Sequence, residues 1–216
     1  MTIQARRSET QPMKADRTIA KILSGEPTLI VALGDSLTYG WMVSKGYLDF
    51  LGEFLRAEYP DSAIRIMNRG IPGDTAQGGV SRVRNDVIRH RPDCALVQFG
   101  LNDAFVGCSP EQFRCSMEAI VEEIHECEET EIVIVTSVCL GGAKDNAFID
   151  RFYRVLEDLA LKHNLPVVRV HKYWQQKIAG GVKFESLVQF DNVHPNMVGY
   201  RYMAEAVMDV FSPSLS

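Results

Sequence analysis

The chain has 216 residues, of which 46% are hydrophobic and 24% charged, so it can bury a core of ordinary size and is neither a disordered nor a fibrous protein. Its formal net charge of −5 argues against nucleic acid or an anionic membrane surface as the main partner, because both attract a basic face. No apolar run approaches the roughly 20 residues of a membrane-spanning helix. We therefore expect neither a nucleic-acid partner nor a membrane partner.

The first 26 residues predict a polar lead-in to a single domain that occupies residues 27–216. Arg6 and Arg7 are not followed by the apolar segment of a secretory signal, which favours a cytoplasmic location. A short helix is expected near residues 18–23. The five cysteines are odd in number and include no closely spaced pair, so a disulfide framework or a zinc site is not expected.

Five short apolar runs predict the strands of a parallel sheet. Each run is apolar on both faces, and several are rich in branched side chains, as expected for strands that helices cover on both sides. In chain order the runs are residues 28–33, 63–67, 94–99, 132–136 and 166–170.

Amphipathic stretches lie between these runs and predict helices. Ser109 and Pro110 have the character of an N-cap and a first helical residue, opening a helix that extends to about residue 128. Similar apolar stripes occur at residues 152–159 and 200–210. One more stripe with helical spacing is formed by Tyr47, Phe50, Leu51, Phe54 and Leu55. The alternation of strands and helices predicts one doubly wound α/β domain.

Polar segments follow the predicted strands or precede the last helix. In open parallel sheets, ligands bind beyond the carboxyl ends of the strands. The segments 34–40, 68–75 and 100–103 each follow a strand, and segment 191–196 precedes the last helix. We therefore expect the functional site where these four segments converge.

Three side chains in these segments suit nucleophilic catalysis. Ser36 lies between a strand and a helix start, where its hydroxyl can face the edge of the sheet. His194 is the natural base, because a neutral imidazole accepts and returns a proton near pH 7. Asp191, three residues earlier, can hold the imidazole in one tautomer and stabilise its charged form. Together they predict a catalytic triad.

Acyl transfer also needs hydrogen-bond donors for the oxyanion that forms. The backbone N–H groups of Ser36 and Gly73 and the side-chain amide of Asn102 are the candidates, and each such donor typically contributes roughly 3 kcal/mol. Gly70 is an alternative to Gly73, since either glycine lets the backbone approach a ligand closely.

The sequences GDSLTYG, NRGIPGDT, GLND and DNVHP resemble the four blocks of the SGNH hydrolases, also called the GDSL esterase/lipase family. The resemblance covers residues 29–210 and carries the family's catalytic and oxyanion positions onto Ser36, Gly73, Asn102, Asp191 and His194. It implies a flavodoxin-like three-layer α/β/α sandwich with strand order 2-1-3-4-5. It also implies a reaction without a cofactor.

The leading hypothesis is a serine hydrolase that cleaves small-molecule carboxylic esters through an acyl-enzyme. Short connections at the site edge favour an open site and small acyl groups. The substrate-pocket candidates are Phe105, Val106, Leu140 and Phe184. His171 follows the fifth strand and is expected at the rim of the site.

Three alternatives stay open. A thioesterase or an acyltransferase would use the same residues. A metal-dependent phosphoesterase would use Asp35, Asn102, Asp103 and His194 as ligands. A non-catalytic binding domain is the third, although the chain has neither a dinucleotide-binding glycine motif nor a P-loop. The sequence gives no indication of the oligomeric state.

Overall fold

A computed structural model describes residues 13–127 and 129–213 and contains one parallel sheet with the strand order β2-β1-β3-β4-β5. The five strands are β1 (Thr28–Gly34), β2 (Ile64–Gly70), β3 (Cys94–Gln98), β4 (Glu131–Val135) and β5 (Val167–Val168). The predicted α/β class and strand order are confirmed. The fifth strand is shorter than predicted, because Val170 already begins a helix.

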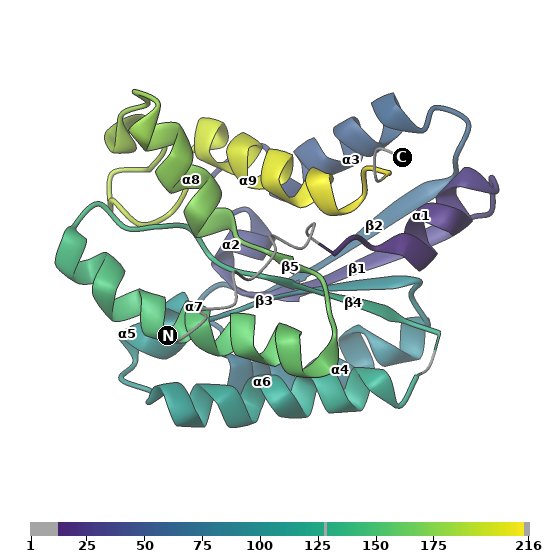
Figure 1. Cartoon of the computed structure of the whole chain (residues 1–216), viewed down its shortest axis with the longest axis horizontal. Helices are drawn as coiled ribbons and strands as arrows, with labels where there is room; N and C mark the ends of the chain where they lie inside the picture. Colours follow the sequence, from purple (N-terminus) through teal and green to yellow (C-terminus); the bar gives the residue numbers. More distant parts are fainter. Residues whose placement is uncertain (1–12, 128, 214–216) are drawn as a thin grey trace, which may run out of the picture.

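Helices cover both faces of the sheet and make the three layers seen in Figure 1. One face carries α1 (Asp16–Leu23), α3 (Tyr47–Glu58), α8 (Val170–Ala179) and α9 (Met197–Val210). The other carries α4 (Ala76–Asp86), α6 (Pro110–His125) and α7 (Ala143–His163). Four short helices complete the described chain: α2 (Ser36–Tyr39), α5 (Leu101–Phe105), η1 (Ile88–His90) and η2 (Phe184–Ser186).

Burial follows the predicted pattern in the central strands. Every residue of β3 is buried, and β1 is buried except for Leu29, which fits strands covered by helices on both faces. In α3 the predicted stripe is only partly buried, because Leu51 and Leu55 are enclosed whereas Phe50 and Phe54 lie at the margin of the core. The central strands of the sheet therefore lie in the core of the domain.

The predicted start of α6 is confirmed in detail. The Ser109 hydroxyl accepts the N–H of Gln112 at 3.1 Å, and the Gln112 side chain accepts the N–H of Ser109 at 2.9 Å. This reciprocal pair satisfies two backbone donors that a helix start leaves open. The helix ends at His125, slightly earlier than predicted, and residue 128 lies outside the described residues.

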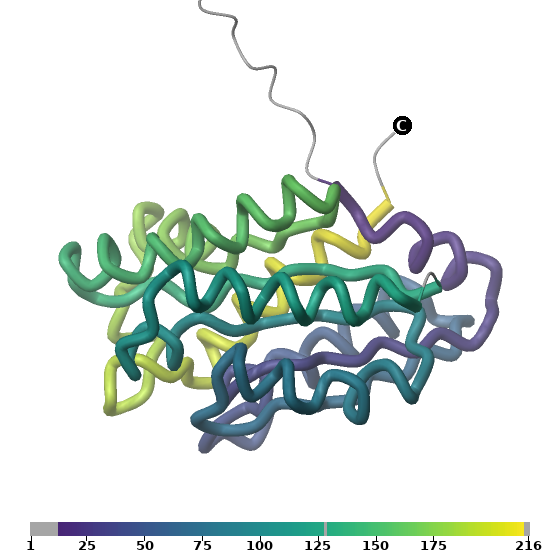
Figure 2. The backbone as a smooth tube through the Cα atoms, turned by 90° about the horizontal axis from the view of Figure 1, so that it is seen from below, coloured from purple at the N-terminus to yellow at the C-terminus, as the bar shows by residue number. Residues whose placement is uncertain are grey.

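The described part of the predicted lead-in packs on the domain. The short helix expected at residues 18–23 is confirmed as α1, which starts at Asp16 and buries Ile19 and Ile22. Just before it, the N–H of Ala15 donates to the carbonyl of Val210 at 2.9 Å, so the start of α1 lies beside the end of α9 (Figure 2). Residues 1–12 lie outside the described residues. Of the helices described, none is both long enough and apolar enough to cross a membrane.

Strand register brings the polar segments together. Gly34, at the end of β1, pairs with Gly70 of β2 on one side and with Gln98 of β3 on the other. Gln98 in turn pairs with Val135 at the end of β4. Because these four strands end level with one another, the residues that follow them share one edge of the sheet.

Candidate active site

Ser36 is the first residue of α2 and lies directly beyond the end of β1. Asp35 caps this helix, and its Oδ1 accepts the N–H of Leu37 at 2.8 Å. The turn needs a glycine at position 34, because a Cβ there would lie 2.2 Å from the Thr38 Oγ1 atom. This tight turn holds the backbone of Ser36 at the carboxyl edge of the sheet.

Three predicted side chains meet in a line at this edge. The Nε2 atom of His194 lies 2.9 Å from the Oγ atom of Ser36, although the two residues are 158 positions apart in the chain. The other ring nitrogen, Nδ1, lies 2.5 Å from Oδ2 of Asp191. Such an arrangement lets the imidazole accept the serine proton while a carboxylate faces the opposite side of the ring.

The carboxylate of Asp191 is held in its charged form by its own turn. Its Oδ1 accepts the N–H groups of Val193 and His194, each at 3.0 Å. Partial burial opposes ionisation, but these hydrogen bonds and the contact with the His194 ring outweigh it and lower the pKa of Asp191 below its ordinary value. Asp191 therefore stays negative near neutral pH.

The loop that carries His194 is closed by backbone contacts. Val188 and Pro195 form an isolated antiparallel bridge, and the N–H of Gln189 donates to the His194 carbonyl at 2.8 Å. Asn196 then caps α9 by accepting the N–H groups of Val198 and Gly199. The imidazole is thus presented from a short, braced turn between η2 and α9.

The candidate oxyanion donors differ in the contacts that they already make. Gly73 has a φ of +79°, a conformation that favours glycine, and no described residue accepts its N–H. The N–H of Gly70 already donates to Oδ1 of Asn68 at 2.8 Å. Asn102 donates from Nδ2 to the carbonyl of Asp74 at 2.8 Å, which leaves its second amide hydrogen without a described acceptor. These contacts favour Gly73 over Gly70 as a donor.

A buried polar cluster, which sequence reasoning missed, supports the serine turn from below. Gln98 donates from Nε2 to Ser137 Oγ at 2.8 Å and to Asp35 Oδ2 at 3.3 Å, and its Oε1 accepts the Thr38 hydroxyl at 2.8 Å. All four side chains are buried. Burial raises the pKa of Asp35 to about 7, against the opposing effect of its hydrogen bonds. The signal available in the sequence was a single amide inside the apolar run CALVQF.

The ligand set of the metal alternative is engaged in other contacts. Asp35 holds the start of α2, and Oδ1 of Asp103 accepts the N–H of Ala76 at 3.0 Å. Burial raises the pKa of Asp103, which disfavours the charged form that a cation would need. Across residues 13–127 and 129–213, no three His, Cys, Asp or Glu side chains gather as a metal site requires. The hypothesis of a metal-dependent phosphoesterase is therefore not favoured.

The four pocket candidates occupy different environments. Phe105 and Val106 are exposed at the end of α5, four residues or fewer beyond Asn102. Leu140 is buried, and both its backbone groups bond to the side chain of Asn146. Phe184 packs against Gly141, where an added Cβ would approach the ring to 2.8 Å. Their part in substrate binding stays a prediction.

Trp41 is a neighbour of the site that sequence reasoning did not single out. Its ring centroid lies 6.3 Å from that of His194, and its carbonyl accepts the side-chain amide of Gln189 at 2.8 Å. Trp41 therefore borders the imidazole from the loop after α2. In the sequence it stands one residue beyond the GDSLTYG block, with no pattern to mark it.

The prediction for His171 was wrong. His171 belongs to α8, and its side chain is buried in the protein rather than placed at the rim of the site, with only 3% of the residue surface accessible. Nδ1 lies 2.8 Å from the Thr136 hydroxyl, and the ring stacks on Tyr153 with centroids 4.4 Å apart. The reason is that β5 ends at Val168 and α8 turns the residue inward.

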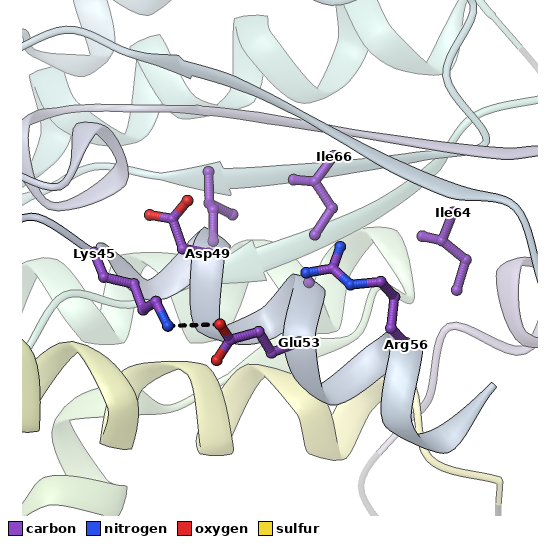
Figure 3. Close-up of a pocket in the computed structure, with 8 residues that line it drawn as sticks. Lys45, Asp49, Glu53, Arg56, Ile64 and Ile66 are labelled. Atoms are coloured by element: carbon purple, nitrogen blue, oxygen red, sulfur yellow. Dashed lines mark hydrogen bonds and ion pairs between the residues drawn. The ribbon is translucent and has the colours of Figure 1, made fainter. Parts of the chain in front are cut away.

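A separate cavity of about 280 Å³ lies between α3 and the edge strand β2 (Figure 3). Lys45 and Glu53 form an ion pair at its mouth, with Nζ and Oε1 2.5 Å apart. Arg56, Ile64 and Ile66 are among the other residues that line the cavity. None of the predicted site residues lines it, so it is distinct from the cluster around Ser36.

A family model, two related sequences and a solved structure that match this chain are those of lipases, acylhydrolases or esterases. Residues 32–202 match the model of the GDSL-like lipase/acylhydrolase family. An acetylxylan esterase of Geobacillus stearothermophilus is 24% identical over 87% of this chain and 94% of its own length. Esterase TesA of Pseudomonas aeruginosa is 26% identical over 87% of this chain and 89% of its own length. The crystal structure of Axe2, an acetylxylan esterase from Geobacillus stearothermophilus, superposes with a TM-score of 0.79 at 22% identity, covering 88% of this chain and 96% of the other.

Proposed function

The chain belongs to the GDSL-like lipase/acylhydrolase family, as the resemblance of its four blocks predicted, and we propose that it is a serine hydrolase that cleaves carboxylic esters through an acyl-enzyme. The observation that carries this proposal is the line of hydrogen bonds from Ser36 through His194 to Asp191. A hydroxyl, an imidazole and a carboxylate in this order make an activated nucleophile.

The first half-reaction uses all three side chains. Nε2 of His194 takes the Ser36 proton as Oγ attacks the carbonyl carbon of the ester, and the carbonyl oxygen becomes an oxyanion. The N–H groups of Ser36 and Gly73 and the amide of Asn102 donate to that oxygen. Asp191 stabilises the imidazolium. His194 then protonates the departing alcohol as the bond to the alkoxy oxygen breaks.

The second half-reaction releases the acid. His194 removes a proton from water, and the hydroxide oxygen attacks the acyl carbon bonded to Ser36. The tetrahedral species collapses, the Ser36 oxygen regains its proton from His194, and the carboxylic acid leaves. An alcohol in place of water would give acyl transfer by the same steps. A thioester differs only in its leaving group.

We propose small acyl groups, acetyl to butyryl, as the preferred substrates. Two observations support this choice. The connections at the site edge are short, with Asp35 alone between β1 and α2 and residues 71–75 between β2 and α4. An acetylxylan esterase is among the relatives that cover most of this chain.

The test is hydrolysis of p-nitrophenyl acetate by the full chain and by its Ser36→Ala variant. We expect the variant to lose roughly 10⁴-fold or more in kcat/KM, because the nucleophile is gone. Ser81→Ala, which removes an exposed hydroxyl on α4, is the matched control and should retain full activity. A folded Ser36→Ala variant with near wild-type turnover would refute the proposal.

A series of p-nitrophenyl esters tests the substrate class separately. We expect kcat/KM to be highest between acetyl and butyryl. A maximum at long acyl chains would overturn the size preference while leaving the serine mechanism intact. A fluorophosphonate probe identifies the nucleophile independently, since it should label Ser36 in the wild-type protein and nothing in the Ser36→Ala variant.

A further inference from the structure

Arg82 is a largely buried arginine of α4, with 14% of its side chain accessible, that reaches back to the ends of two strands. Its Nη2 donates to the carbonyl of Gly34 at 2.9 Å, at the end of β1. Its Nη1 donates to the carbonyl of Arg69 at 2.7 Å, near the end of β2. One guanidinium therefore ties together the ends of neighbouring strands.

The same guanidinium also binds the loop that follows β2. Nε and Nη2 both contact Oδ2 of Asp74, at 2.8 Å and 2.7 Å. Nη1 makes a further contact of 2.8 Å with Oδ2 of Asp86. A guanidinium has five N–H donors in a fixed plane, and four hydrogen bonds and one further ion-pair contact engage all three nitrogens of Arg82.

The segments joined by Arg82 are those that carry two of the proposed oxyanion donors. Gly34 stands two residues before Ser36, and Asp74 directly follows Gly73. The Gly34 carbonyl that Arg82 binds also accepts the N–H of Ile71 at 3.0 Å, which begins the Gly73 loop. The backbone carbonyl of Asp74 accepts the third candidate donor, Asn102. Asp74 is thus held by Arg82 through its side chain and by Asn102 through its backbone.

Packing does not fix Gly73 itself. A Cβ built at this position would meet no atom within 4 Å, so no other part of the chain packs against that side of the residue. The direction of its N–H is therefore set by the hydrogen bonds on either side of it. The nearest of these spans Gly73, because the N–H of Asp74 donates to the carbonyl of Ile71 at 3.1 Å, and Arg82 anchors the carboxylate of the same Asp74.

We propose that Arg82 is a positioning residue that fixes the N–H of Gly73 relative to Ser36 and thereby sets the geometry of the oxyanion hole. The inference rests on the proposed function of this site. An oxyanion donor acts only when it is aimed at the place where charge develops, so a small rotation of the loop weakens transition-state binding more than substrate binding. A lysine retains the charge but has no planar fork with which to hold two carbonyls and a carboxylate at once.

The experiment compares Arg82→Ala and Arg82→Lys with wild type in the full chain. With p-nitrophenyl acetate we expect kcat to fall about 10- to 100-fold and KM to change less than about threefold, as for the loss of an interaction made only in the transition state. Affinity for a trifluoromethyl ketone, which forms an oxyanion on Ser36, should fall by the same factor as kcat/KM. Ethylguanidinium should restore part of the activity of Arg82→Ala and none of that of Arg82→Lys.

Arg84→Ala is the matched control. Arg84 lies on the same helix, but its side chain is exposed and pairs with Glu123 and Glu126. This variant should keep wild-type kcat and wild-type affinity for the ketone. Asp74→Asn tests the same link from the other side. It weakens the charged contact with Arg82 and should lower kcat about threefold to tenfold with KM unchanged.

Several results would overturn the proposal. They are a kcat within threefold of wild type in both arginine variants, a change confined to KM, or an unchanged affinity for the ketone. Unfolding of Arg82→Ala together with full activity in Arg82→Lys and Asp74→Asn would show a purely structural role and would also overturn it. Failure of the proposed function looks different, since the wild-type protein would then hydrolyse no ester and Ser36 would resist labelling.

Discussion

His194 and His171 both lie near the carboxyl edge of the sheet, and their surroundings differ in every respect relevant to proton transfer. His194 stands in a loop with 23% of its side chain accessible, between a hydroxyl at Nε2 and a carboxylate at Nδ1. His171 lies in α8 with 3% accessible, and its ring is packed on Tyr153 and bonded to the neutral hydroxyl of Thr136.

Electrostatics separate the two rings further. Burial, reinforced by the nearby Lys172, lowers the pKa of His171 to about 4, against the opposing charge of Glu157. His171 therefore stays neutral near pH 7, and the group in contact with its Nδ1 is a hydroxyl rather than a carboxylate. At His194 the charged carboxylate of Asp191 is in direct contact. The comparison teaches that position at the functional edge does not make a histidine a base; the partners of its two nitrogens do.

The largest expected effect separates the two histidines by activity. His194→Ala should lower kcat/KM for p-nitrophenyl acetate by roughly 10⁴-fold or more, because the proton acceptor for Ser36 is lost. His171→Asn should keep kcat/KM within about threefold while losing stability, since it removes a buried ring that packs and bonds but faces no reacting atom. Steady-state kinetics and urea unfolding of both variants make the comparison.

The two outcomes can fail independently. A His194→Ala variant with near wild-type turnover would remove His194 from the mechanism. A folded His171→Asn variant that loses as much activity as His194→Ala would show that the buried imidazole also serves the reaction, and the contrast between the two environments would then carry no mechanistic meaning.

A smaller effect is expected at the carboxylate that distinguishes His194. Asp191→Asn should lower kcat/KM roughly 10²- to 10⁴-fold, because an amide neither stabilises the imidazolium nor holds its tautomer. The remaining oxygen can still accept the N–H groups of Val193 and His194, so the turn should stay folded. Asp191→Ala, which loses those bonds as well, is the comparison variant. Equal activity of Asp191→Asn and wild type would refute the role of charge.

Much of the fold was predictable because local pattern and global packing agree. Strands apolar on both faces, such as β3, require helices above and below, and only a few topologies satisfy that demand. The start of α6 was readable because its cap uses adjacent residues. The short β5 was overestimated, because a run of apolar residues does not reveal where a chain leaves a strand for a helix.

The candidate site also contains residues that the sequence predicted and residues that it did not. Ser36, His194 and Asp191 stand in recognisable blocks, and the structure brings His194 within hydrogen-bonding distance of both Ser36 and Asp191. Gln98 and Arg82 stand in no block and reach the site through long side chains from a strand and a helix. Such contacts depend only on which residues the tertiary fold brings together, so no spacing in the sequence predicts them. His171 was misplaced for the same reason, since burial is a property of the assembled core.

The smallest expected effect is a change with pH in the free energy of unfolding, caused by the buried His171. The pKa of His171 is about 4 in the folded chain, below the ordinary value of 6.5 that the unfolded chain restores. Between pH 6.5 and pH 4 this imidazole therefore takes up a proton only on unfolding. Acidification favours the unfolded state, and stability is lost as the pH falls. From pH 8 to pH 5 the loss due to this one group should be about 2 kcal/mol.

His171→Asn should lack that contribution. Urea unfolding of wild type and variant at pH 8 and pH 5 measures it as a difference of differences, so the cost of the lost packing and the titration of groups common to both proteins cancel. The gap between wild type and variant should narrow by about 2 kcal/mol on acidification. A gap that is the same at both pH values would mean that His171 is protonated as readily inside the fold as outside it. That result would contradict its enclosure beside Tyr153 and Thr136, and with it the electrostatic half of the comparison with His194.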